Sequence, residues 1–203
     1  MFPSLPLSKY RKYRSAGKRL NHKMLEALGS KHIIEKSAKA LGLSKNHTLI
    51  LDTEDDLSVI MDYALYEIRV NGKNLVQRYQ EEIGGASRIE RELLVSKAKA
   101  KTSLFKVVEV YSRRNQLDLL DLVGCRKITL ADINLSQTAV EGTVMFLRLI
   151  ELPAFTITSG IAFLFAEDME KTLVKRWAKW KGADRYAKFF KLSKSKGLPI
   201  EYV

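Results

Sequence analysis

The spacing of apolar residues changes twice along this chain, and these changes constrain the fold more than any other feature. Up to about residue 101, apolar residues recur every three or four positions, as they do on the buried face of a helix. From Ser103 to about Ala166 the spacing shortens to two, which is typical of strands, and beyond Ala166 the helical spacing returns. The pattern predicts an α+β protein in which helical segments flank a strand-rich middle.

Capping and terminating residues divide the first part into helices. The apolar pattern of Leu20–Leu28 stops at Gly29. Ser30 is then placed to cap a second helix that ends at Gly42. These signals predict two consecutive helices at the N-terminus.

The clearest helix begins after Thr53, which has capping-box spacing with Asp56. Its apolar stripe runs through Leu57–Ile68, and we expect Asn71-Gly72 to end it. Two further helices are expected, one on each side of Gly84-Gly85. Together these helices predict one helical unit.

Five runs rich in β-branched and aromatic residues follow one another between residues 103 and 166. Short strands at such intervals are typical of a small barrel or sandwich. We therefore predict a five-stranded antiparallel barrel or sandwich. The expected strands are Leu104–Tyr111, Leu117–Val123, Ile128–Ile133, Thr143–Leu152 and Phe155–Phe165.

The same patterns predict five segments along the chain. The helical unit and the β module form the body, and a basic helical segment packs back onto it through its aromatic residues. The predicted boundaries are 1–14 for a loose basic N-terminus, 15–101 for the helical unit, 103–166 for the β module, 167–195 for the basic C-terminal helices and 196–203 for a tail.

Positive charge is concentrated at the two ends of the chain. Residues 1–23 contain seven basic residues and no acid, and residues 171–196 contain ten basic residues and one acid. The net charge of the two ends together exceeds that of the whole chain, which is +12, so the middle carries a net negative charge. A field of one sign attracts polyanions or anionic lipid.

The basic ends predict a non-catalytic protein that binds nucleic acid, with RNA or single strands favoured over duplex DNA. The C-terminal aromatic residues have the spacing of a buried helix face, so we assign them to packing rather than to base stacking. Binding to one nucleic acid requires the two basic ends to converge on one face. The expected contact residues are Arg11, Arg14, Arg19, Lys175, Arg176, Lys179 and Arg185.

An alternative hypothesis is a protein-interaction or scaffold module. In that case the β module binds a protein partner, and the basic ends serve solubility. An enzyme of another type is a third hypothesis.

Several other motifs are weaker. Ser37–Ser44 has the glycine-turn pattern of a helix-turn-helix, but the segment that would read DNA ends in four acids that repel phosphates. Acids at the start of a helix complement its dipole, so we assign them to capping rather than to a metal site. We interpret Thr158-Ser159-Gly160 as a turn between two strand-like runs. The four acids are Asp52, Glu54, Asp55 and Asp56.

Composition and motif content argue against several classes of protein. The three histidines are scattered and no glycine-rich phosphate loop is present, so we expect no catalytic residue, metal or cofactor. A single cysteine excludes an intramolecular disulfide framework. No run approaches the roughly 20 apolar residues of a membrane span, so we expect a cytoplasmic protein.

Part of the chain resembles a known group of proteins. Asp52–Tyr66 (DTEDDLSVIMDYALY), together with Thr102–Val107 and the strand-rich stretch to Phe165, is similar to a group of uncharacterised bacterial proteins. Members of the group pair a helical N-terminal part with a small β-barrel-like module. The likeness spans about residues 40–165 and implies this two-part architecture and a bacterial origin, but no activity. The basic extension after Lys171 lies outside it.

Overall fold

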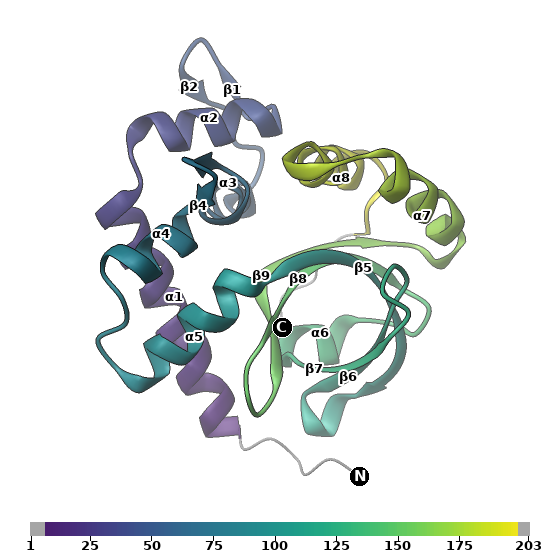
Figure 1. Ribbon diagram of the computed structural model, residues 1–203. Coiled ribbons are helices and arrows are strands. Elements are labelled where there is room, and N and C mark those ends of the chain that lie inside the picture. The colour runs from purple at the N-terminus through teal and green to yellow at the C-terminus, as the bar shows by residue number, and fades with distance from the viewer. Residues whose placement is uncertain (1–6, 199–203) are drawn as a thin grey trace.

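The computed structural model describes residues 7–198, in which helices stand on both sides of a five-stranded sheet (Figure 1). The predicted α+β class is therefore confirmed. Two small hairpins, β1–β2 (Ser44–Lys45 and Thr48–Leu49) and β3–β4 (Arg69–Val70 and Lys73–Asn74), lie between helices of the first half. The helices are α1 (Leu7–Leu28), α2 (Lys31–Leu41), α3 (Glu54–Tyr66), α4 (Leu75–Glu82), α5 (Arg88–Lys99), α6 (Ile133–Thr138), α7 (Glu170–Lys179) and α8 (Gly182–Lys196).

Several predicted helix boundaries are confirmed. α1 ends before Gly29, and the hydroxyl of Ser30 accepts a hydrogen bond from the Ile33 amide at 3.3 Å to cap α2. At the start of α3, the Asp56 carboxylate accepts a hydrogen bond from the Thr53 amide at 3.3 Å, as the capping-box spacing predicts. Local sequence therefore sets these boundaries.

The N-terminus is more ordered than predicted. Residues 7–14, which we expected to be loose, belong to α1. Tyr10 and Tyr13 are buried and continue the apolar row of Ala16 and Leu20 at helical spacing, so burial of the two aromatic rings extends the helix. Residues 1–6 of the predicted loose segment lie outside the described residues.

The predicted helix end at Asn71-Gly72 is instead the turn of a hairpin. α3 ends at Tyr66, and β3 pairs with β4 across Asn71 and Gly72, which both have positive φ. Two positive φ values define a type I′ turn, for which Asn-Gly is the favoured sequence. The dipeptide therefore acts as a hairpin signal here and not as a helix cap.

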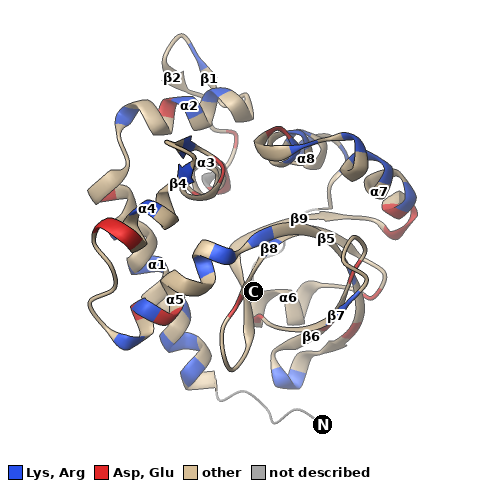
Figure 2. Cartoon of the chain, viewed as in Figure 1, with Lys and Arg blue, Asp and Glu red and all other residues tan. Residues whose placement is uncertain are grey.

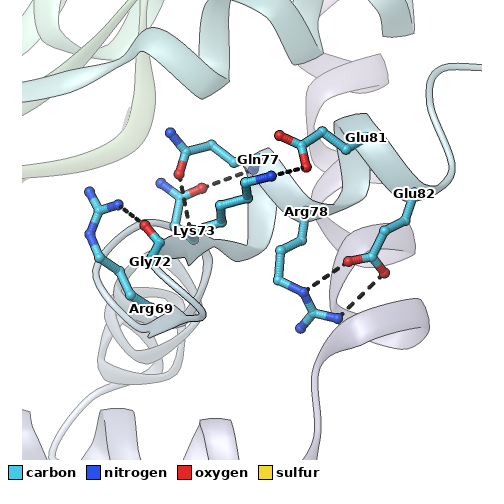
Figure 3. A network of polar contacts seen from close by, with 8 residues as sticks. Arg69, Gly72, Lys73, Gln77, Arg78, Glu81 and Glu82 are labelled. Atoms are coloured by element: carbon cyan, nitrogen blue, oxygen red, sulfur yellow. Dashed lines mark hydrogen bonds and ion pairs between the residues drawn. The ribbon is translucent and has the colours of Figure 1, made fainter.

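The β3–β4 hairpin joins directly to α4 (Figure 3). The Asn74 side chain accepts a hydrogen bond from the Gln77 amide at 2.9 Å, and the Gln77 side chain accepts one from the Asn74 amide at 3.0 Å. Lys73 forms an ion pair with Glu81 across the same joint. The reciprocal bonds between Asn74 and Gln77 satisfy the backbone amides of these two residues at the start of α4.

The five expected strands of the β module are all present, but their sheet is mixed. The hydrogen-bonded order is β5-β6-β7-β9-β8 and returns to β5, which closes the sheet into a barrel. β7 and β9 are parallel and pair through Leu130 and Thr156, so the prediction of antiparallel strands only is wrong. The chain reaches β9 through α6 and β8, and such a crossover allows parallel pairing. The strands are β5 (Lys101–Tyr111), β6 (Gln116–Asp121), β7 (Lys127–Ala131), β8 (Val144–Glu151) and β9 (Thr156–Phe165).

Strand β8 separates two cores. Met145 and Leu147 point into the small barrel core, whereas Phe146 and Ile150 belong to the larger core that the barrel shares with the helices. Successive side chains of a strand point to opposite faces, so both faces of β8 are buried and its sequence is almost continuously apolar. The outer face of the barrel and the helices thus share the larger core, and the barrel interior forms the smaller one.

Strand β9 contains a bulge where we expected a turn. Ala162 pairs with Leu147 and Thr158 pairs with Leu149, so three residues of β9 stand opposite Arg148 alone. Gly160, inside the bulge, has a φ of +119°, a conformation that side chains with a Cβ rarely adopt. Thr158-Ser159-Gly160 therefore bends a continuous strand.

The C-terminal helices pack on the outer face of the barrel through aromatic side chains. Phe189 is fully buried, and its ring stacks on Phe146 with the ring centroids 4.5 Å apart. Trp177 and Trp180 are half-buried and pack against the same core. After α8, the Leu198 amide donates to the Leu164 carbonyl at 2.8 Å. Residues 199–203 of the predicted tail lie outside the described residues.

Candidate functional site

A groove of about 1030 Å³ runs between α1 and the bulged part of β9. α3, α5 and the start of α6 contribute the remaining walls. We call it the α1 groove. Its polar lining includes Arg11, Arg14, Lys18, Arg19, Asn21, Asp62, Lys97, Asp132 and Ser159.

One face of α1 supplies a row of cations to this groove. Arg11, Arg14 and Lys18 recur at intervals of three and four residues, so they project from the same side of the helix. Arg11, Lys18 and Arg19 are exposed, and none of the three forms an ion pair with the described part of the chain. Arg19 donates a hydrogen bond to the hydroxyl of Ser15 at 2.6 Å. Two of the predicted contact residues therefore stand open to a ligand.

Arg14 turns into the groove and binds its far wall. Its Nη1 donates to the Thr158 carbonyl at 2.8 Å, and its Nη2 lies 3.5 Å from Oδ2 of Asp132. The Asp132 carboxylate also caps α6 by accepting the Leu135 amide at 3.1 Å. Arg14 thus ties α1 to the barrel, and its charge is partly compensated.

Lys97 of α5 lies in a buried part of the groove and is 2% exposed. Its Nζ donates to Oδ1 of Asn21 at 2.8 Å and to the Tyr66 hydroxyl at 3.3 Å. Both acceptors are neutral, and no carboxylate within residues 7–198 forms an ion pair with this amine. A buried ammonium without a counter-ion is costly, so such a lysine marks a functional candidate.

The surroundings of Lys97 favour the neutral amine. Burial lowers the pKa of Lys97 to about 8. The negative charge of Asp62 opposes this shift, whereas the positive charges of Arg14 and Arg148 add to it. The neutral amine is therefore more populated near neutral pH in Lys97 than in an exposed lysine.

Arg148 is a second buried cation, on β8 at the joint between barrel and helices. Its Nη2 lies 2.6 Å from Oε1 of Glu67 and 3.6 Å from Oδ2 of Asp62, and its guanidinium stands 4.0 Å from the centre of the Tyr66 ring. Burial alone would lower the pKa of Arg148, but these two carboxylates raise it above its ordinary value. Arg148 is a fixed positive charge beside the Lys97 site.

The Ser159 hydroxyl adds an unsatisfied group to the groove. Its Oγ is buried and has no hydrogen-bond partner among the described residues. The β9 bulge places it next to Thr158, which holds Arg14. Bulges occur frequently beside functional sites because they redirect side chains.

The predicted C-terminal contact residues lie elsewhere. Lys175 and Lys179 are exposed on α7. Arg176 lies 5.5 Å from the centre of the Trp180 ring and Arg185 lies 3.8 Å from that of Trp177, so both guanidinium groups pack on the indoles. Of the four, the two lysines are the ones that face solvent without an aromatic contact.

The two basic regions do not form one surface. In Figure 2, the Lys and Arg residues of α1 and those of α7 lie on opposite sides of the view, with the barrel and α3 between them. The condition for both basic ends to bind one nucleic acid, convergence on one face, is therefore not met. Arg11, Arg14 and Arg19 share the α1 groove, and the C-terminal cations form a separate ridge.

The acids before α3 bind the C-terminal helix. Nζ of Lys194 lies 2.6 Å from Oδ1 of Asp56 and 3.4 Å from Oδ2 of Asp52. Burial alone would raise the pKa of Asp56, but its hydrogen bonds to Lys194 and to backbone amides lower it. Asp56 thus caps α3, and the two carboxylates together tie the start of α3 to α8. Across residues 7–198, no group of three or more His, Cys, Asp or Glu side chains could hold a metal ion.

A family model covers residues 6–203, which is nearly the whole chain. The chain belongs to the family of unknown function DUF7986. Comparison with curated proteins and with solved structures finds no match. Membership in the family agrees with the resemblance to uncharacterised proteins, and it extends over the basic C-terminal helices. Within the described part of this family member, none of the helices has the length and apolar character needed to cross a bilayer.

Sequence analysis missed Lys97, Asp62 and Arg148, although each left a signal. Lys97 follows Leu93 by four positions and therefore shares its buried face of α5. Arg148 is the one charge within the apolar run of β8. A charge on the apolar side of an element is the pattern that would have revealed all three.

Asp62 was missed because the buried face of α3 is wider than the predicted apolar stripe. Leu57 and Met61, expected in the core, are 38% and 37% exposed, but the other four residues of the stripe are buried: Ile60, Ala64, Leu65 and Ile68. Val59, Tyr63 and Tyr66 are also buried and widen the packed face to include Asp62. The large tyrosine rings contribute much of this additional buried area.

Proposed function

We propose that this protein binds single-stranded nucleic acid, RNA in particular, along the α1 wall of the groove. The observation that carries this proposal is the set of three exposed cations in the groove lining, Arg11, Lys18 and Arg19, which have no carboxylate partners in the described chain. Phosphate oxygens would provide the missing negative charge.

The length of the row suits an extended ligand. The lining residues of α1 run from Tyr10 to Leu25, which at 1.5 Å per residue corresponds to roughly 22 Å of helix. Apolar side chains of α6 and β9, such as Ile133 and Ile157, form part of the opposite wall. A single strand of nucleic acid fits this arrangement when its phosphates lie along α1 and its bases face the apolar side.

The binding we propose depends on charge and shows little sequence preference. The aromatic residues of α1, Tyr10 and Tyr13, are buried, and Tyr13 donates its hydroxyl to Oε2 of Glu92 at 2.5 Å. Their faces therefore do not supply a stacking platform for bases. Phosphate contacts then dominate the affinity, and they weaken steeply as salt concentration rises.

The ridge on α7 is a second candidate surface for the same ligand. Lys171, Lys175 and Lys179 are exposed, lie four residues apart, and form no ion pair within the described residues. Like charges at this spacing destabilise a helix unless an anion lies near them. None of these three lysines lines the α1 groove, and we favour that groove because it can enclose a strand.

The test is fluorescence anisotropy with mixed-sequence RNA across a salt series, using matched lysine variants. Lys18→Glu reverses an exposed charge in the groove, and Lys36→Glu reverses an exposed charge on α2, outside the groove lining. Lys18→Glu should weaken binding about tenfold at low salt and reduce the salt slope by about 0.7 per lost phosphate contact. Lys36→Glu should change the affinity less than twofold.

Three results would contradict the proposal. The first is no RNA binding at low salt, and the second is an equal loss in Lys18→Glu and Lys36→Glu. The third is a loss confined to a Lys175→Glu/Lys179→Glu variant, which would move the binding surface to α7. Binding of a protein partner through the barrel, with RNA binding absent, would favour the scaffold hypothesis.

A further inference from the structure

Lys97 combines three properties that exposed lysines lack. It is 2% exposed, it forms part of the wall of a large groove, and its hydrogen-bond acceptors are an amide and a phenol. A lysine that only stabilises the fold is expected to pair with a carboxylate when it is buried. Lys97 does not do so within the described chain, although Asp62 is near enough to influence its charge.

The charged groups around Lys97 come from three other elements, and their effects on its pKa differ in sign. Arg14 of α1 and Arg148 of β8 place positive charge near the amine, and Asp62 of α3 places negative charge there. Asp62 lies within ion-pair distance of Arg148, at 3.6 Å, and forms no ion pair with Lys97. Tyr66 of α3 contributes a neutral hydroxyl. Desolvation and neighbouring cations are the two conditions that make a lysine nucleophilic.

The neutral fraction of this amine follows from its pKa. With a pKa of about 8, roughly a quarter of Lys97 is unprotonated at pH 7.5, against about 0.1% for a lysine at 10.5. The difference is about 200-fold in the concentration of the reactive form. The lower basicity reduces the intrinsic nucleophilicity of the amine, but by less than this factor.

We propose that Lys97 is a reactive amine that forms an imine with aldehydes carrying a negatively charged group. The nitrogen lone pair attacks the carbonyl carbon and gives a carbinolamine. Loss of the oxygen as water, with the two hydrogens of the amine, then forms the C=N bond. The step consumes no oxidant or reductant, and hydrolysis reverses it.

The negative charge of the ligand class follows from the groove. Arg11 and Lys18 line it and lack ion-pair partners within residues 7–198, so they would attract an anionic group on the aldehyde to the groove. The lining also includes the buried apolar side chains of Ile150 and Leu93. Restricted water there favours the imine over its hydrolysis.

The experiment uses pyridoxal 5′-phosphate as the probe aldehyde. The full-length protein is incubated with the probe at pH 7.5, the imine is reduced with borohydride, and the labelled lysines are identified by peptide mass spectrometry. Lys97 should be labelled at least tenfold faster than the exposed Lys36 and Lys175, which serve as internal controls in the same sample. Pyridoxal, which lacks the phosphate, should label Lys97 more slowly.

A variant completes the test. Lys97→Met should lose the fast phase of labelling, whereas Lys36→Met should keep it. The proposal is overturned if Lys97 is labelled no faster than the exposed lysines in the wild-type protein. This result can be read whether or not Lys97→Met folds. The experiment does not depend on RNA binding, because the probe contains no nucleic acid.

Discussion

Arg148 and Lys97 are two buried cations in neighbouring parts of one core, and they have opposite surroundings. Arg148 is 4% exposed and lies within ion-pair distance of Glu67 and Asp62, whereas Lys97 is 2% exposed and bonds an amide and a phenol. The carboxylates raise the pKa of Arg148, and burial lowers that of Lys97. With equal burial, the partners decide whether a cation stabilises the fold or remains available for chemistry.

The largest effect that this comparison predicts comes from removing the paired cation. Arg148→Met should lower the free energy of unfolding by about 3–5 kcal/mol, because it leaves Asp62 and Glu67 without their counter-ion. Urea denaturation measures the change. Arg126→Met is the matched control, because Arg126 is 52% exposed and also pairs with two acids, and it should cost less than about 1 kcal/mol. Equal losses in the two variants would show that burial of Arg148 does not matter.

Removing the unpaired cation should have a smaller effect that depends on pH. The folded-state pKa of Lys97, about 8, lies below its unfolded value of 10.5, so between these values the unfolded chain binds more protons and stability rises with pH. Below pH 8 the full free-energy cost of burying the Lys97 ammonium, about 3 kcal/mol, is present. Lys97→Met should therefore stabilise the protein by about 2 kcal/mol at pH 7, after the loss of its hydrogen bonds.

The measurement is urea denaturation of wild type and Lys97→Met between pH 7 and pH 10. The stability difference should shrink as pH rises, because the wild-type protein regains stability while the variant has no amine to titrate. The other lysines and tyrosines are common to both proteins and cancel. A difference that stays constant with pH would place the pKa of Lys97 near its ordinary value.

The features that could be predicted from the sequence depend on neighbouring residues, and those that could not be predicted depend on residues far apart in the chain. The caps at Ser30 and Asp56 and the five strands of the β module follow from residues close in sequence, and they were predicted. The parallel pairing of Leu130 with Thr156 joins distant segments, so alternation along one strand could not reveal it. The bulge opposite Arg148 likewise depends on the register of β8 against β9.

Only part of the candidate site could be predicted from the sequence, for a related reason. The sequence shows the positive charges of Arg11 and Arg19 within the basic N-terminal segment, and the structure places both residues at the groove. Whether a charge is compensated depends on tertiary contacts, which the sequence does not show. Arg185 was predicted to contact the ligand, but it packs on Trp177. Lys97 was not predicted, but it is buried without a counter-ion among the described residues.

The smallest predicted effect concerns Asp62, which acts on both cations. Its negative charge raises the pKa of Lys97, so Asp62→Asn should lower that pKa below about 8. Arg148 keeps its 2.6 Å contact with Glu67 in this variant. At pH 7.5 the neutral fraction can rise from about a quarter to at most one, so labelling of Lys97 should accelerate by no more than about fourfold.

The pH profile of labelling separates this effect from a general loosening of the core. In Asp62→Asn the half-maximal rate should move to lower pH while the maximal rate does not rise, since the protonation equilibrium of Lys97 shifts and the less basic amine is a slightly weaker nucleophile. Glu67→Gln is the control, because Glu67 contacts Arg148 but is not among the groups that shift Lys97. An equal shift in both variants would mean that the Arg148 cluster and Lys97 act as one electrostatic unit, and the contrast between the two cations would fail.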